Sequence, residues 1–151
     1  MPTGYAVLNT AAVALVAATA KSILSVIQGA GVAARITELA VSFDGVAAAN
    51  TPVLVELCQS TQATTGTSTA FTPVLTRGQV RTVQSTAAVN YTAEPTVLTV
   101  IKTWLIHPQT SYPMQLPLSR EPERVGAGAF VLRCTAPQAV NVRAHVEFEE
   151  G

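Results

Sequence analysis

Residues 140–148 read VNVRAHVEF, and this stretch decides the fold class. Apolar side chains occupy every second position: Val140, Val142, Ala144, Val146 and Phe148. Polar side chains fill the positions between them: Asn141, Arg143, His145 and Glu147. A period of two residues is typical of a β-strand with one buried and one solvated face, and it has no good helical interpretation. One-sided burial also favours an antiparallel sheet.

The same period recurs along much of the chain. Alternation extends over residues 38–43, 53–58 and 130–135, and residues 21–28 form a further strand candidate. Nine glycines and nine prolines occur in the chain, many of them between these segments. Short strands separated by such breakers are typical of a sandwich or barrel. We therefore predict an all-β fold, an antiparallel β-sandwich with a jelly-roll-like arrangement.

Residues 96–107 read TVLTVIKTWLIH and are apolar or β-branched on both faces, except for Lys102. A strand with two apolar faces is usually covered on both sides. The pattern predicts a central strand here, with Trp104 in the core.

The N-terminal residues 1–20 form either an arm or the first strand, and residues 21–151 form one β-sandwich domain. Residues 11–20, AAVALVAATA, are too few to span a bilayer as a helix, and the first lysine follows them at position 21. A helix over residues 10–20 is an alternative. Frequent valine and threonine and the lack of one clean apolar stripe favour a strand.

The chain has 151 residues, of which 48% are hydrophobic and only 12% charged, with a formal net charge of +0. Typical domains are about 25% charged, so either partners cover part of the surface or a neutral, threonine-rich surface faces water. No basic run follows a phosphate backbone or an anionic membrane, so we expect neither nucleic-acid nor membrane binding.

Catalytic patterns are weak. Asp44 is the one aspartate, and His107 and His145 are the two histidines. No nucleophile elbow, phosphate-binding loop or dinucleotide motif occurs, and no spacing supports a metal site. We expect a non-enzyme without a cofactor. Cys58 and Cys134 lie in strand-like segments, where buried free thiols are expected, although a disulfide is an alternative.

Two clusters of charge remain. Glu147, Glu149 and Glu150 lie at the C-terminal end, where we expect a solvated tail. The segment SREPER, residues 119–124, lies in a proline-rich connection and is either a salt-bridged loop or a charged contact at an interface. The residues that we expect to contact a partner are Arg120, Glu121, Glu123 and Arg124.

An ordered set of segments resembles small β-rich virion proteins of tailed bacteriophages that decorate or cement the capsid. These segments are Ser42-Phe43-Asp44-Gly45, residues 52–57 (PVLVEL), Thr65-Gly66-Thr67, residues 90–96 (NYTAEPT) and the closing strand over residues 140–150. The resemblance covers most of the chain from about Thr19 onward.

The resemblance implies a protein on the capsid surface of a virion, made in the host cytoplasm. It would bind the major capsid protein and itself, often as a homotrimer, and stabilise the capsomer lattice by contact area. Residues 1–20 would then serve as an arm that adds to a neighbouring sheet. Two alternatives are a tail-associated or receptor-binding β module, and a small hydrolase that uses His107 or His145 with a glutamate.

Overall fold

The computed structural model describes residues 2–44, 51–61 and 66–151, and these residues form thirteen strands and no helix. The first seven strands are β1 (Thr3–Leu8), β2 (Val13–Leu15), β3 (Ala20–Ile27), β4 (Ala33–Asp44), β5 (Val53–Ser60), β6 (Thr67–Phe71) and β7 (Val74–Arg77). The remaining six are β8 (Thr86–Ala93), β9 (Leu98–Ile106), β10 (Ser111–Gln115), β11 (Glu123–Val125), β12 (Ala129–Thr135) and β13 (Val140–Glu150).

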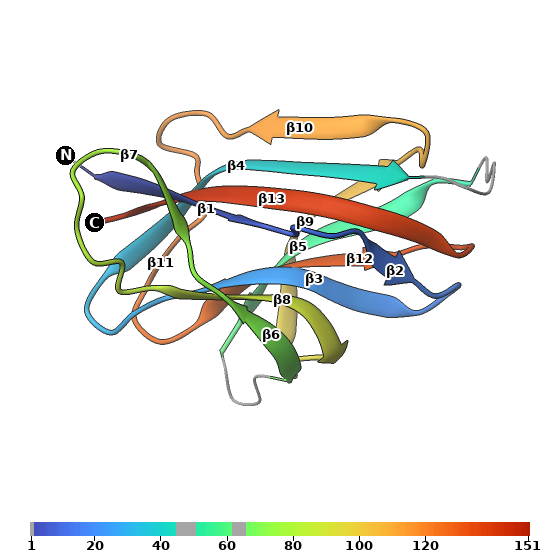
Figure 1. Cartoon of the computed structure of the whole chain (residues 1–151), viewed down its shortest axis with the longest axis horizontal. Helices are drawn as coiled ribbons and strands as arrows, with labels where there is room; N and C mark the ends of the chain where they lie inside the picture. The colour runs from blue at the N-terminus through green and yellow to red at the C-terminus, as the bar shows by residue number, and fades with distance from the viewer. Residues whose placement is uncertain (1, 45–50, 62–65) are drawn as a thin grey trace.

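The strands form two antiparallel sheets packed against each other, which confirms the predicted all-β sandwich (Figure 1). One sheet has seven strands, with β10-β4-β13-β1-β7 along its path, β11 beside β4 and β2 beside β13. The other has six strands in the order β6-β8-β3-β12-β5-β9. The jelly-roll-like arrangement stays a prediction. Gly45, in the quoted Asp44-Gly45 pair, lies outside the described residues.

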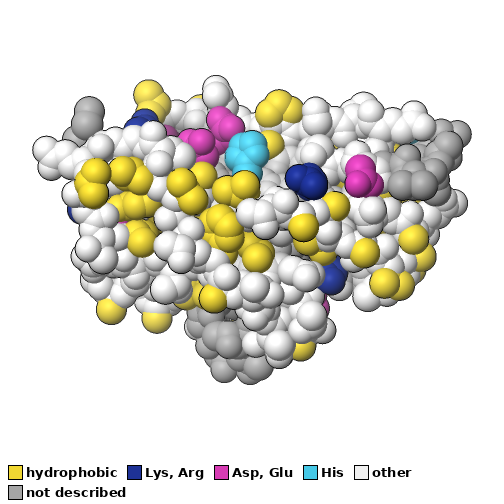
Figure 2. Space-filling model, in the orientation of Figure 1, with side chains coloured by type: hydrophobic (Ala, Val, Ile, Leu, Met, Phe, Trp, Pro, Cys, Tyr) yellow, Lys and Arg dark blue, Asp and Glu magenta, His cyan; other side chains and the backbone are white. Residues whose placement is uncertain are grey.

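β13 lies in the middle of the seven-stranded sheet. It pairs with β4 on one side and with β1 and β2 on the other. Its alternation appears in the structure as predicted: Val142, Val146 and Phe148 are buried, whereas Arg143 is exposed on the outer face. Figure 2 shows that outer face, where charged side chains lie along the middle of the sheet and hydrophobic ones gather over β1 and β7.

The core lies between the inner faces of the two sheets. β13 and β1 contribute Phe148 and Tyr5, whose ring centroids lie 5.6 Å apart with planes tilted by 30°. β12 lies between β3 and β5, and its Leu132 is fully buried. Each large apolar side chain buried in this way stabilises the fold by about 1.5–3 kcal/mol. The core therefore requires no disulfide or metal ion.

The N-terminal segment forms two strands of the seven-stranded sheet. β1 lies between β13 and β7 of the same chain, with Thr3 opposite Glu150 and Leu8 opposite His145. Val7 on this strand is fully buried. Farther along, Val13–Leu15 form the short strand β2 beside β13.

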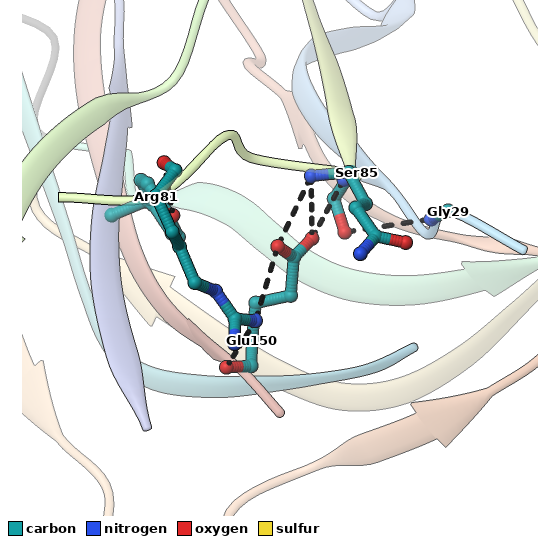
Figure 3. A network of polar contacts seen from close by, with 6 residues as sticks. Gly29, Arg81, Ser85 and Glu150 are labelled. Atoms are coloured by element: carbon teal, nitrogen blue, oxygen red, sulfur yellow. Dashed lines mark hydrogen bonds and ion pairs between the residues drawn. The ribbon is translucent and has the colours of Figure 1, made fainter. Parts of the chain in front are cut away.

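Glu150 corrects the prediction of a solvated C-terminal tail, because its side chain is fully buried. It continues the inner-face positions of β13, and the segment before β8 returns to meet it (Figure 3). The carboxylate accepts hydrogen bonds from the backbone N–H of Ser85 at 2.6 Å and of Gln84 at 3.1 Å. Arg81 donates to its backbone oxygen at 3.1 Å and lies 3.5 Å from its Oε2. Glu150, at the end of β13, therefore anchors residues 81–85, which lie between β7 and β8 and belong to neither strand.

The environment of Glu150 holds its pKa below the ordinary value. Burial alone raises the pKa, but hydrogen bonds from Ser85 and Gln84 and the charge of Arg81 outweigh burial. A carboxyl whose folded pKa is lowered contributes stability above its unfolded pKa, about 4.3. That contribution disappears as the pH falls from there through the folded pKa.

Glu150→Gln should lower the free energy of unfolding at pH 7 by about 2 kcal/mol, because an amide presents N–H groups to backbone donors. It should also lose less stability than the parent protein between about pH 5 and pH 3. Urea unfolding followed by Trp104 fluorescence over this pH range measures both effects. Glu147→Gln, on the outer face of the same strand, is the matched control. Equal stability of the two variants at pH 7 would show that the anchor is unimportant.

Candidate interaction surfaces

β9 is an edge strand, which corrects the prediction that residues 96–107 form a central strand covered on both faces. It pairs with β5 and is the last strand of the six-stranded sheet. A four-residue turn at residues 107–110 leads directly to β10, the edge of the other sheet. Both strands therefore lie at the same edge of the sandwich, and Trp104 is half-buried, 6.3 Å from Tyr112 between ring centroids.

Large apolar side chains are exposed along β9 and just before it. We call this set the β9 surface, and it comprises Val97 (58% exposed), Val100 (41%), Ile101 (36%) and Leu105 (71%). Scattered apolar side chains are normal on a protein surface, but several on one strand indicate an interaction site. The sequence contains this apolar run, but it does not indicate that these side chains lie on an exposed side of the strand.

Lys102 carries the one charge on β9. It lies opposite Leu57 of β5, and Trp104 lies opposite Val55, so both residues project from the side of the strand that faces the core. Ile101 is the extra residue of a bulge between these pairs and the pair of Cys58 with Val100. The β9 surface is therefore neutral, with a cation at its inner border.

The four predicted partner contacts, Arg120, Glu121, Glu123 and Arg124, do not form one cluster. Glu123 belongs to β11, and its Oε2 accepts hydrogen bonds from Arg35 of β4 at 2.6 and 2.8 Å. The side chain of Arg124 passes over Gly128, where a Cβ atom would collide with it. Glu123 of SREPER thus forms a salt bridge within the chain.

The other two residues lie elsewhere. The backbone N–H of Arg120 donates to the carbonyl of Pro117 at 3.0 Å in a turn. Glu121 lines a hollow of about 340 Å³ on the outer face of the seven-stranded sheet, together with Arg77, Gln115, Glu147 and other residues of that face. A partner role for these four side chains stays a prediction.

His145 forms a hydrogen-bonded pair with Glu38 on the same outer face. Its Nε2 lies 3.1 Å from Oε1 of Glu38, and Oε2 of the same carboxylate accepts a hydrogen bond from Gln115 at 3.2 Å. The hydrogen bonds from His145 and Gln115 lower the pKa of Glu38 and outweigh its partial burial, which raises that pKa. An ionised carboxylate beside a histidine is one element of acid–base chemistry.

A second hollow, of about 290 Å³, lies beside this pair. His145, Arg143, Ser42, Ser111 and Pro113 are among the residues that line it. His107 lies in the turn after β9, where its Nδ1 accepts a hydrogen bond from the backbone N–H of Gln109 at 3.2 Å. Of the two histidines named for a hydrolase, His145 is thus the one that has a glutamate at hydrogen-bonding distance among the described contacts.

Both cysteines are free and fully buried. Cys134 packs in the core between the sheets, whereas Cys58 packs with Ala129 and Val131 in a second cluster. Burial raises the pKa of Cys58 to about 11 and that of Cys134 to about 12. Neither thiol is suited to act as a nucleophile at neutral pH.

Comparison of the chain with protein-family models, with curated proteins and with solved structures found no match. Within residues 2–44, 51–61 and 66–151, no helix is long and apolar enough to cross a membrane. No group of three or more metal-ligating acidic, histidine or cysteine side chains converges in the same part of the chain. The resemblance to phage decoration proteins stays a prediction.

The native protein should leave both thiols unmodified by a thiol-specific disulfide reagent at pH 8, because they are protonated and inaccessible. In denaturing urea, two thiols per chain should react within minutes. Spectrophotometric titration measures both numbers, and Cys58→Ser and Cys134→Ser variants identify the thiols. Rapid labelling of the folded protein would contradict the buried positions.

Proposed function

We propose that this chain is a structural virion protein that binds the outside of a tailed-phage capsid and stabilises the capsomer lattice. The observation that carries the proposal is the β9 surface, a neutral strip of exposed apolar side chains at one edge of the sandwich. Such a strip is suited to binding by contact area rather than by chemistry. A stable interface buries about 1,200–2,000 Å² in total, so further surface must take part.

The composition and the fold support the same function. Low charge across the chain reduces the number of ions that must be desolvated at an interface. A sandwich whose core lies between two sheets holds its surface strands in place. The proposed partner is the major capsid protein, with synthesis in the host cytoplasm. The resemblance also implies a homotrimer in a jelly-roll-like fold.

Cryo-electron microscopy of particles from the phage that encodes the chain tests this function. We expect density for the sandwich on the exterior of the capsid, at regular positions between capsomers. Density on the tail would favour the tail-associated or receptor-binding module instead. Absence of the chain from purified particles would contradict both.

The predicted contacts are tested by adding purified protein to particles that lack it. Charge reversal at Arg120 and Glu121 should lower occupancy about tenfold if these side chains face the capsid. Glu123 is unsuitable for this test, because its change would also break the pair with Arg35. Glu56→Gln, on the six-stranded sheet, is unsuitable as the control, because it would break the ion pair of Glu56 with Arg133 at 2.8 Å. Val16→Gln is the better control, because Val16 is 66% exposed and does not line the hollow that Glu121 lines.

A small hydrolase is the second candidate, because the structure pairs His145 with Glu38 beside a hollow that Ser42 and Ser111 also line. Under the main proposal, the purified protein hydrolyses an activated ester no faster than His145→Ala and His107→Ala variants do. Release of nitrophenolate from a nitrophenyl ester measures this rate. Hydrolysis that is lost in His145→Ala and kept in His107→Ala would establish the hydrolase instead.

A further inference from the structure

The outer side of β9 is an open sheet edge. β9 pairs with β5 along residues 98–106, and no other described strand pairs with its second side. Its unpaired backbone groups form a template to which another strand can add. A strand of nine residues is about 30 Å long, enough for several pairs of backbone hydrogen bonds.

The other edges of the sandwich differ from β9. β10 carries Pro113, which has no N–H to donate, and β7 has four residues. β6 has five residues and an irregular register with β8. Proline, short length and irregularity are the usual features that prevent a sheet edge from pairing. β9 has the weakest protection, which consists of Lys102 and the bulge at Ile101.

We propose that two copies of this chain pair antiparallel through β9, about a two-fold axis that passes through Thr103. Ile101 then lies opposite Leu105 of the partner subunit on the outer face. Lys102 lies opposite the partner subunit's Trp104 on the inner face. The two six-stranded sheets become one continuous sheet of twelve strands, from the six in each copy.

Charge favours this register over one with the axis through Lys102. An axis through Lys102 would place two ammonium groups directly opposite each other, which is unfavourable. An axis through Thr103 places each ammonium beside an indole ring, an attractive arrangement. It also places a threonine opposite a threonine at the centre, a favourable cross-strand pair. The same strand thus complements itself in apolar contacts and in charge.

This inference uses the same strand as the proposed capsid contact, but it rests on the unpaired backbone edge of β9 and not on capsid binding. It differs from the homotrimer that the resemblance implies. An isologous pair of edges closes at two copies, whereas a trimer requires two different surfaces to meet.

Sedimentation equilibrium of the full chain tests the proposal with two substitutions that introduce opposite charges across the two-fold axis. We expect the parent protein at twice the chain mass of 15.7 kDa. Ile101→Glu and Leu105→Lys should each raise the dissociation constant about 100-fold, because each replaces the apolar contact between these two side chains on both sides of the two-fold axis. The double variant should regain affinity to within about tenfold of the parent, because the new carboxylate faces the new ammonium across the axis.

Leu118→Glu is the matched control, since Leu118 is 89% exposed and lies outside β9. It should leave the dimer unchanged. Circular dichroism and urea unfolding establish that each variant is folded. A monomeric parent protein, a trimer, or a double variant no tighter than the single variants overturns the two-fold pairing. A trimer that binds capsids would overturn the two-fold pairing but would support the proposed function.

Discussion

Pairing of β13 on both of its sides is the constraint on which the rest of the sandwich depends. Its backbone groups are satisfied by β4 on one side and by β1 and β2 on the other. Its inner side chains then project towards the six-stranded sheet, where Phe148 meets Tyr5 in the core. A shift of β13 by one residue would exchange its apolar and charged faces, so the core fixes its register. The buried Glu150 extends this constraint to the segment before β8, which its carboxylate anchors.

The fold class was predictable because alternation records which face of a strand is buried. Val142 and Val146 are buried and Arg143 is exposed, as their positions predicted. Whether a strand lies in the centre or at the edge of its sheet is not visible in this alternation. The apolar run of residues 96–107 is equally compatible with a central strand and with an edge strand, and the structure has the edge. Lys102 was the one residue in the run that favoured partial exposure.

The surfaces were less predictable than the fold, since they depend on contacts between distant strands. Glu150 was expected in water because it is charged and near the C-terminus, yet amides about 65 residues earlier in the chain bind it. Glu38 and His145 meet because β4 and β13 are neighbours in a particular register. Glu123 of the charged segment SREPER forms an ion pair, and its partner, Arg35, lies on another strand. Alternation within one segment contains none of this information.

The pairing of β1 with β13 has a consequence for the order in which the protein folds. Thr3 lies opposite Glu150, so two strands from almost opposite ends of the sequence are neighbours in the sheet. Closing so long a loop is entropically costly, and domains rich in such distant contacts fold in milliseconds to seconds rather than microseconds. During synthesis, β1 completes this pairing only after β13 has left the ribosome. The apolar strands made in between are then transiently exposed, and a chaperone that shields them would increase the yield of folded protein.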